Sequence, residues 1–203
     1  MPLCPLRGAV SRLRRREYQL TSAACTAFFM YASADCLTQC LRARRDARSR
    51  VAIDLRRMVR TGITSALLSG CLAVLYFGWL ERTITLPLAW REVLDVRLSA
   101  CVSVLGKIGV DVGVYEPCYD TLYITIQALL RGEGFAQAWA EVQLKVLRVW
   151  AMAPRYWCFA DALNFSLVPL RLRPMTNALL SIPWSMYISS VANANVGRTA
   201  AAP

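Results

Sequence analysis

The sequence predicts an all-α integral membrane protein, a bundle of four or five spans with one interfacial amphipathic helix. Apolar residues make up 56% of the 203 residues and charged residues 18%, whereas soluble domains average about 45–50% and about 25%. The mean hydropathy is +0.37. Two stretches, 61–80 and 174–197, contain no charged residue. This composition argues against a soluble or disordered chain, so we expect lipid to surround much of the fold.

The net charge of +11 comes mainly from the first third of the chain. Residues 1–60 hold 13 Arg and four acidic residues, a balance of +9, which leaves +2 for residues 61–203. Residues 1–16 contain five Arg and no acidic residue. They resemble a mitochondrial targeting segment and equally fit a basic flank of the first span. We expect no nucleic-acid partner, because no aromatic or Gly-rich element accompanies this charge.

The transmembrane bundle is expected to occupy residues 17–194, ahead of a short flexible tail, 195–203. Residues 18–41 contain one charge, Asp35, and a helix of that length crosses a hydrocarbon core of about 30 Å. The second span, 61–80, carries small residues at every fourth position: Gly62, Ala66 and Gly70. Such a stripe lets another helix approach closely in lipid.

Between these spans, residues 42–60 form an Arg-rich connector without Gly or Pro. We expect it to bind anionic lipid headgroups, since each basic residue near such a surface contributes about 1 kcal/mol. After the second span, residues 81–95 are more polar and contain Pro87 and Trp90. They are expected to form a loop with an interfacial aromatic residue.

The second half of the chain is apolar but interrupted. Residues 96–130 contain Pro117, which is expected to kink or break a helix near its middle. Residues 135–149 place apolar side chains at helical spacing between polar ones, which predicts an interfacial amphipathic helix. Residues 149–170 and 174–197 can each cross, so the count of spans stays at four or five.

Catalytic and metal sites find little support in the sequence. The chain has no histidine, which excludes Ser-His and Cys-His catalysis and His-ligated metals. Its eight cysteines form no CxxC pair, and no phosphate-binding loop is present. We expect neither an enzyme nor a bound cofactor or metal ion.

Ionisable residues inside apolar stretches are the candidate functional residues, because each costs about 2.5–3.5 kcal/mol at a helix centre on insertion scales. Lys107 and Asp111 share a helical face. Asp161 and Asn164 share another, together with Trp157. Both sets are expected either to line a path for small solutes or to join helices as neutralised pairs and hydrogen-bonded clamps.

A third set lies where the connector enters the second span. Asp54, Arg57 and Arg60 stand three residues apart. They are expected to form an interfacial ion-pair cluster, or alternatively the polar rim of a pore mouth.

Several sequence blocks occur at the spacing of a known family. Asn164-Phe165-x-x-Val168-Pro169-x-x-x-Arg173 is followed by Trp184-x-x-Tyr187-Ile188-Ser189, and Trp157 precedes the first block by seven residues. Further matches involve Asp35 with Gln39, Asp54 with Arg57 and Arg60, Gly70, and Lys107 with Asp111 and Pro117. In these blocks the chain resembles the Mpv-seventeen / peroxisomal-membrane-protein-twenty-two family over roughly residues 17–190. It departs from the family pattern at Val74, Val112, Cys158 and Asp161.

The resemblance implies a membrane protein of the mitochondrial inner membrane or, alternatively, of a peroxisome-type membrane. It also implies a weakly selective channel for small solutes that takes part in organelle homeostasis. The alternative is a non-conducting scaffold or assembly factor that binds anionic lipid or partner membrane proteins. A homo-oligomer is compatible with the sequence, which does not determine the number of subunits.

Overall fold

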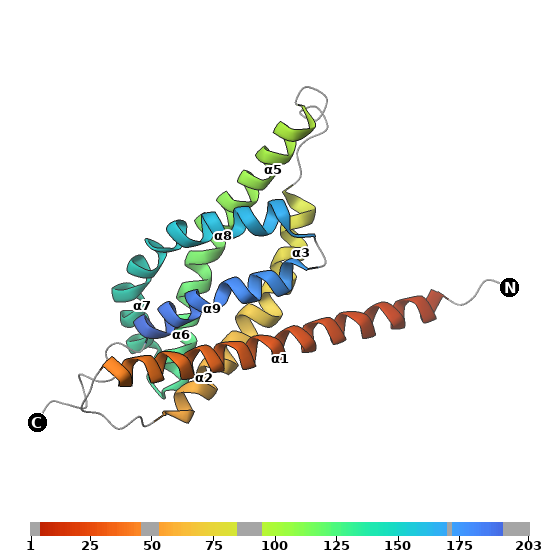
Figure 1. Cartoon of the computed structure of the whole chain (residues 1–203). Helices are drawn as coiled ribbons and strands as arrows, with labels where there is room; N and C mark the ends of the chain where they lie inside the picture. Colours follow the sequence, from red (N-terminus) through yellow and green to blue (C-terminus); the bar gives the residue numbers. More distant parts are fainter. Residues whose placement is uncertain (1–4, 46–52, 85–94, 170–171, 193–203) are drawn as a thin grey trace, which may run out of the picture.

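The protein is helical throughout the part of the chain that the structure describes. The computed structural model describes residues 5–45, 53–84, 95–169 and 172–192, and within these ranges it contains helices, turns and no strand (Figure 1). The prediction of an all-α fold is confirmed. The expected tail, residues 195–203, and the expected interfacial loop around Pro87 and Trp90 lie outside the described residues, as does the centre of the connector, 46–52.

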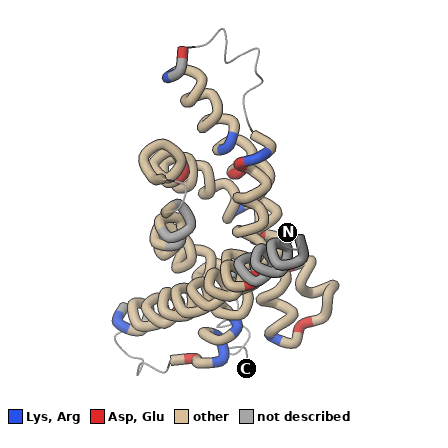
Figure 2. The backbone as a smooth tube through the Cα atoms, turned by 90° about the vertical axis from the view of Figure 1, so that its right-hand side faces the viewer, with Lys and Arg blue, Asp and Glu red and all other residues tan. Residues whose placement is uncertain are grey.

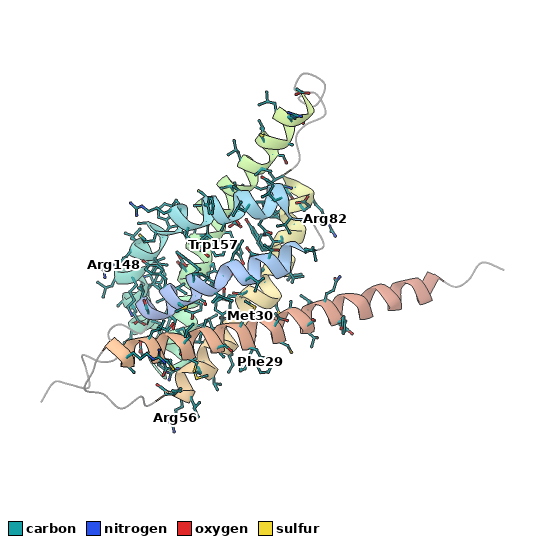
Figure 3. All side chains as sticks on the ribbon, viewed as in Figure 1. Phe29, Met30, Arg56, Arg82, Arg148 and Trp157 are labelled. Atoms are coloured by element: carbon teal, nitrogen blue, oxygen red, sulfur yellow. The ribbon has the colours of Figure 1, made fainter. Side chains whose placement is uncertain are left out.

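The first helix, α1 (Pro5–Arg45), runs across the bundle and extends beyond it at its N-terminal end (Figure 1). It packs against α2, η1 and α9. Its inner face buries Tyr31, Asp35 and Thr38, while Phe29 stands on the outer side (Figure 3). Asp35 binds Arg57 of α2 and Ser189 of α9, and the hydroxyl of Thr38 donates to the carbonyl of Ala34 within α1. These polar groups therefore need not meet lipid.

The second helical segment is continuous from Leu55 to Thr83. It comprises α2 (Leu55–Ser65), a π-helical stretch η1 (Ala66–Leu72) and α3 (Ala73–Thr83). Asp54 caps its N-terminus by accepting a hydrogen bond from the backbone N–H of Arg57 at 3.0 Å. A methyl group built on Gly70 would stand 2.5 Å from the Cα of Ala24 in α1. Only glycine permits this approach of the two backbones.

The third segment is α5 (Val96–Val110), a π-helical turn η2 (Asp111–Tyr115) and α6 (Glu116–Leu130). It packs antiparallel to the second, since Lys107 contacts Glu81 at one end and Gln127 contacts Thr64 at the other. Pro117 stands in the first turn of α6, directly after the π-helical turn. The helix is therefore locally widened, rather than ended, at the predicted interruption.

The fourth segment, α7 (Phe135–Trp150), lies alongside α6 for most of its length. Near its start, Glu141 accepts hydrogen bonds from both Arg131 and Lys145. At its end, the indole N–H of Trp150 donates to the carbonyl of Val112 at 2.9 Å. The predicted amphipathic helix is thus packed lengthwise into the bundle, because the small and branched side chains of its inner face fit against α6.

Arg131 stands at the corner between α6 and α7. Burial alone would lower the pKa of its guanidinium, but the carboxylates of Glu133 and Glu141 raise this pKa above its ordinary value. Arg131 therefore stays charged, and its ion pair with Glu141 holds the end of α6 against α7.

The last two helices are α8 (Ala153–Leu167) and α9 (Arg173–Ala192). α8 follows α7 after the short turn at Ala151–Met152 and packs on α5 and η2, and α9 then returns along α1 and α7 (Figure 1). The largest fully buried apolar side chains come from four helices: Leu80, Tyr123, Ile124, Val149 and Ile188.

Among the described residues, two helical segments are long and apolar enough by themselves to cross a membrane, Leu55–Thr83 and Arg97–Leu130. A shorter apolar stretch covers Leu179–Val191. The expected first span, 18–41, lies inside α1 and is not one of the two. Its buried face combines Ala27, Tyr31 and Ala34 with the polar Asp35 and Thr38. In Figure 2, long stretches without charge separate the coloured Lys, Arg, Asp and Glu residues.

Candidate functional site: a buried polar file

A line of polar side chains follows the facing surfaces of the second and third helical segments. We call it the polar file and define it by two sets of residues. From α2, η1 and α3 come Arg57, Thr61, Thr64, Ser65, Ser69, Tyr76 and Glu81; from α5, η2 and α6 come Lys107, Asp111, Glu116, Tyr119, Asp120, Tyr123 and Gln127. Most of these side chains are buried. Sequence reasoning identifies Arg57, Lys107 and Asp111 but not the line that connects them.

Contacts across the two segments fix the register of the file. The ammonium of Lys107 donates to Glu81 at 2.6 Å, and the hydroxyls of Ser69 and Tyr119 share a hydrogen bond of 2.7 Å. Between these two levels, the rings of Tyr76 and Tyr115 stack with centroids 3.8 Å apart. The polar groups therefore stand at successive depths between two antiparallel helices.

One end of the file is closed by Asp35 of α1. Its Oδ1 accepts from Nε and Nη2 of Arg57 at 3.0 and 2.7 Å and also from the hydroxyl of Ser189 in α9. Its Oδ2 accepts from Gln39 at 2.8 Å, and Gln39 in turn accepts from the backbone N–H of Asp54 at 2.7 Å. Four side chains, that of Asp35 included, and one helix start are thereby joined through one buried carboxylate.

The three residues predicted as an interfacial cluster have separate roles here. Asp54 caps α2 and Arg57 binds Asp35. The Nε atom of Arg60 is buried and has no hydrogen-bond partner among the described residues. The observed partner of Arg57 is Asp35 rather than Asp54, and helical spacing gives no sign of it because the two residues are 22 apart in the sequence.

The other end of the file separates the two residues predicted to share a helical face. Lys107 forms an ion pair with Glu81. The two residues are 26 apart in the sequence, so helical spacing does not predict the pair. Asp111 lies beside Tyr76 and faces Asp161 of α8. Two carboxyl groups from different helices are therefore brought together, while the nearest ammonium binds elsewhere.

The remaining predicted residues surround the file from α8 and α9. Trp157, Asp161 and Asn164 are buried on the inner face of α8, where Trp157 packs against Trp184 at 6.0 Å between ring centroids (Figure 3). Phe165 packs on Phe77 of α3. Val168 and Pro169 end α8, and Tyr187 packs on Trp184. Arg173 begins α9, but its side chain lies outside the described residues.

Many buried polar atoms along the file have no hydrogen-bond partner within the described residues. In the file itself, both carboxylate oxygens of Asp120 lack a donor. Beside the file, on α8 and α9, the same holds for both oxygens of Asp161 and, as donors without an acceptor, for the indole N–H groups of Trp157 and Trp184. Buried polar atoms without partners are uncommon in folded proteins. Within the described ranges, no group of three or more Cys, Asp or Glu residues could hold a metal ion.

Comparisons with known proteins agree with the motifs. Residues 128–189 match the Mpv17 / PMP22 family. Protein sym1 of Aspergillus oryzae is 22% identical over 85% of this chain and 90% of its own length, and Protein SYM1 of Gibberella zeae is 26% identical over 89% and 93%. Mitochondrial inner membrane protein Mpv17 of Homo sapiens is 26% identical over 49% of this chain and 58% of its own length. No solved structure matches. The resemblance and the mitochondrial localisation predicted from the sequence are confirmed.

Proposed function

We propose that this chain, which is similar to the Mpv17 / PMP22 family, is a channel of the mitochondrial inner membrane that passes small solutes along the polar file. The match to the family and the names of the relatives support the membrane and the organelle. The path itself is proposed from the contacts of the described side chains.

The polar file is the observation that carries the proposal. From Lys107 to Gln127 it extends over 20 residues, and a helix of that length rises about 30 Å, which matches the hydrocarbon thickness of a bilayer. Buried ionisable groups are costly in lipid and are retained mainly where they pair or border a polar path. The unpartnered acceptors of Asp120 and Asp161 supply such a border.

Planar-bilayer recording on the purified full chain tests the channel. The wild type is expected to conduct, and Asp111→Asn and Asp161→Asn are expected to change the ion preference. Glu17→Gln, on the exposed part of α1, is the matched control and should leave the currents unchanged. Wild-type protein without conductance would overturn the proposal, and unchanged currents in both Asp variants would remove these carboxyl groups from the path.

We further propose five membrane crossings: α1, the α2–α3 segment, the α5–α6 segment, α7 with α8, and α9. α8 alone has 15 residues, which rise only about 22 Å. α7, however, runs from the level of Arg131 to that of Val112, and α8 continues from its end. Five crossings would put the start of α1 and the end of α9 on opposite sides. Epitope tags at the two chain ends, probed in intact and permeabilised mitoplasts, should then differ in accessibility; equal accessibility would favour four.

A non-conducting scaffold is the second candidate, and the network around Asp35 favours it. Three helices share this carboxylate, which is how polar side chains join helices in lipid. For a scaffold, the file variants should lower stability, and no conductance should be present to lose.

A further inference from the structure

Four buried carboxyl groups form a row in the middle of the polar file. Asp111, Glu116 and Asp120 come from the third helical segment, and Asp161 approaches from α8. Each has at most 4% of its surface exposed. Within the described residues, no Lys or Arg forms an ion pair with any of the four, because Lys107 binds Glu81 and Arg57 binds Asp35. The row therefore gathers four acidic groups without an internal counter-charge.

The π-helical turn η2 is what puts the row in line. In a regular α-helix, two residues five apart point about 140° away from each other. A π-helical turn joins residue i to residue i+5, so Asp111 and Glu116 return to nearly the same face. Glu116 and Asp120 are four apart in α6 and share that face. The carboxyl groups then stand one above another, with a rise of about 6 Å between the last two.

The arrangement suits an extended cation better than a compact one. Among the described residues, no three carboxyl or thiol groups converge closely enough to hold a metal ion. A ligand with several positive charges along a chain could instead meet one carboxylate after another. With single bonds of about 1.5 Å, three or four methylene groups separate two ammonium groups by about 5–6 Å. That separation matches the rise between Glu116 and Asp120.

Side chains next to the row offer further contacts of the required kind. The buried hydroxyl of Tyr76 lies beside Asp111, and its oxygen can accept a hydrogen bond from an ammonium group. On α8, Asn164 lies on the same face as Asp161, is 1% exposed, and has an amide oxygen without a hydrogen-bond donor. The amide oxygen of Asn164 and both oxygens of Asp161 accept no hydrogen bond from the described residues, and an ammonium group could donate to them.

We propose that the row formed by Asp111, Glu116, Asp120 and Asp161 binds a linear polyamine, each of whose ammonium groups meets a carboxyl group of the row. The proposal names a ligand class for the proposed channel and rests on that function for transport. Binding itself does not require conduction, so the two can be tested apart.

Binding is measured on the purified full chain in nanodiscs of phosphatidylcholine, which carries no net charge. Spermidine, putrescine, butylamine and Mg²⁺ are titrated while tryptophan fluorescence and the midpoint of thermal unfolding are recorded. Affinity is expected to rise from the monoamine to the diamine to the triamine, and to exceed that for Mg²⁺. The net charge of +11 disfavours non-specific adsorption of polycations, which makes the ranking informative. Equal responses to spermidine and Mg²⁺, or none, would overturn the proposal.

Variants of the row locate the site. Glu116→Gln and Asp120→Asn should each weaken spermidine binding by about tenfold, and Glu17→Gln should not. Neutralising a buried unpaired carboxylate should also raise the unfolding midpoint without ligand, which separates lost binding from misfolding. Undiminished spermidine affinity in both folded variants would place the ligand elsewhere and refute the assignment.

Bilayer currents separate this inference from the channel proposal. A conducting protein whose sodium current is unaffected by spermidine, and which fails to bind it, would retain the channel and refute the polyamine site. A protein that binds spermidine through the row but does not conduct would refute the channel and retain the site.

Discussion

Arg57 donates twice to a single oxygen of Asp35, at 3.0 and 2.7 Å, and so joins the start of α2 to the middle of α1. The carboxylate side chain is fully buried and the guanidinium is 12% exposed. Removing one member of a buried pair commonly costs about 3–5 kcal/mol, because the other charge is left without a partner.

A double-mutant cycle tests this pair. Asp35→Asn and Arg57→Gln should each lower the free energy of unfolding by several kcal/mol, and the double variant should lose much less than the sum of the two. Unfolding is followed by titration with a denaturing detergent in mixed micelles. Additive losses would mean that the two side chains act independently.

The contribution of α9 to this network can be measured separately. Ser189→Ala removes the hydroxyl that donates to Asp35 and should lower stability by about 1 kcal/mol. Ser166→Ala, on the exposed side of α8, is the matched control and should have almost no effect. Equal effects of the two changes would show that the contact with Asp35 contributes no stability.

The close approach of α1 to the second segment depends on glycine. In Gly70→Ala the new methyl group would collide with the backbone of Ala24, and the helices would have to separate, at a cost of about 1–3 kcal/mol. Gly109→Ala is the control, because no atom lies within 4 Å of the added carbon. It should be neutral or stabilising, since alanine favours a helix over glycine by about 1 kcal/mol. Detergent-unfolding curves that rank the two variants in the opposite order would contradict the packing.

The end of α7 is fixed by a hydrogen bond to the π-helical turn. Trp150→Phe keeps the ring contacts but leaves the carbonyl of Val112 without this donor, and should lower stability by about 1 kcal/mol. Trp139→Phe removes an indole from an exposed face of the same helix and serves as the control. If both variants unfold alike, the bond to Val112 is not a determinant of stability.

The sequence predicts the helical class and many of the residues that prove to be buried and polar. Asp35, Gln39, Asp54 and Arg57 could be selected because family motifs and charges in apolar surroundings mark single positions. The contacts between them could not be predicted, since Asp35 is 22 residues from Arg57 and 154 residues from Ser189. Helical spacing relates only residues within a few turns of one helix.

The same limit explains Lys107 and α7. Helical spacing predicts that Lys107 pairs with Asp111. The antiparallel packing of the second and third helical segments instead places Lys107 beside Glu81. Periodicity also shows that residues 135–149 have an apolar face, but that face could meet lipid headgroups or another helix equally well. Packing against α6 is a property of the assembled chain.

The carboxylate of Asp35 also sets an order of assembly. During synthesis, α1 and α2 emerge first and can satisfy it with Arg57 and Gln39, but the hydroxyl of Ser189 arrives only with the last helix. Insertion of the N-terminal half into the bilayer therefore leaves an incomplete polar junction until α9 arrives. The polar junction is then complete only once α9 has packed against α1.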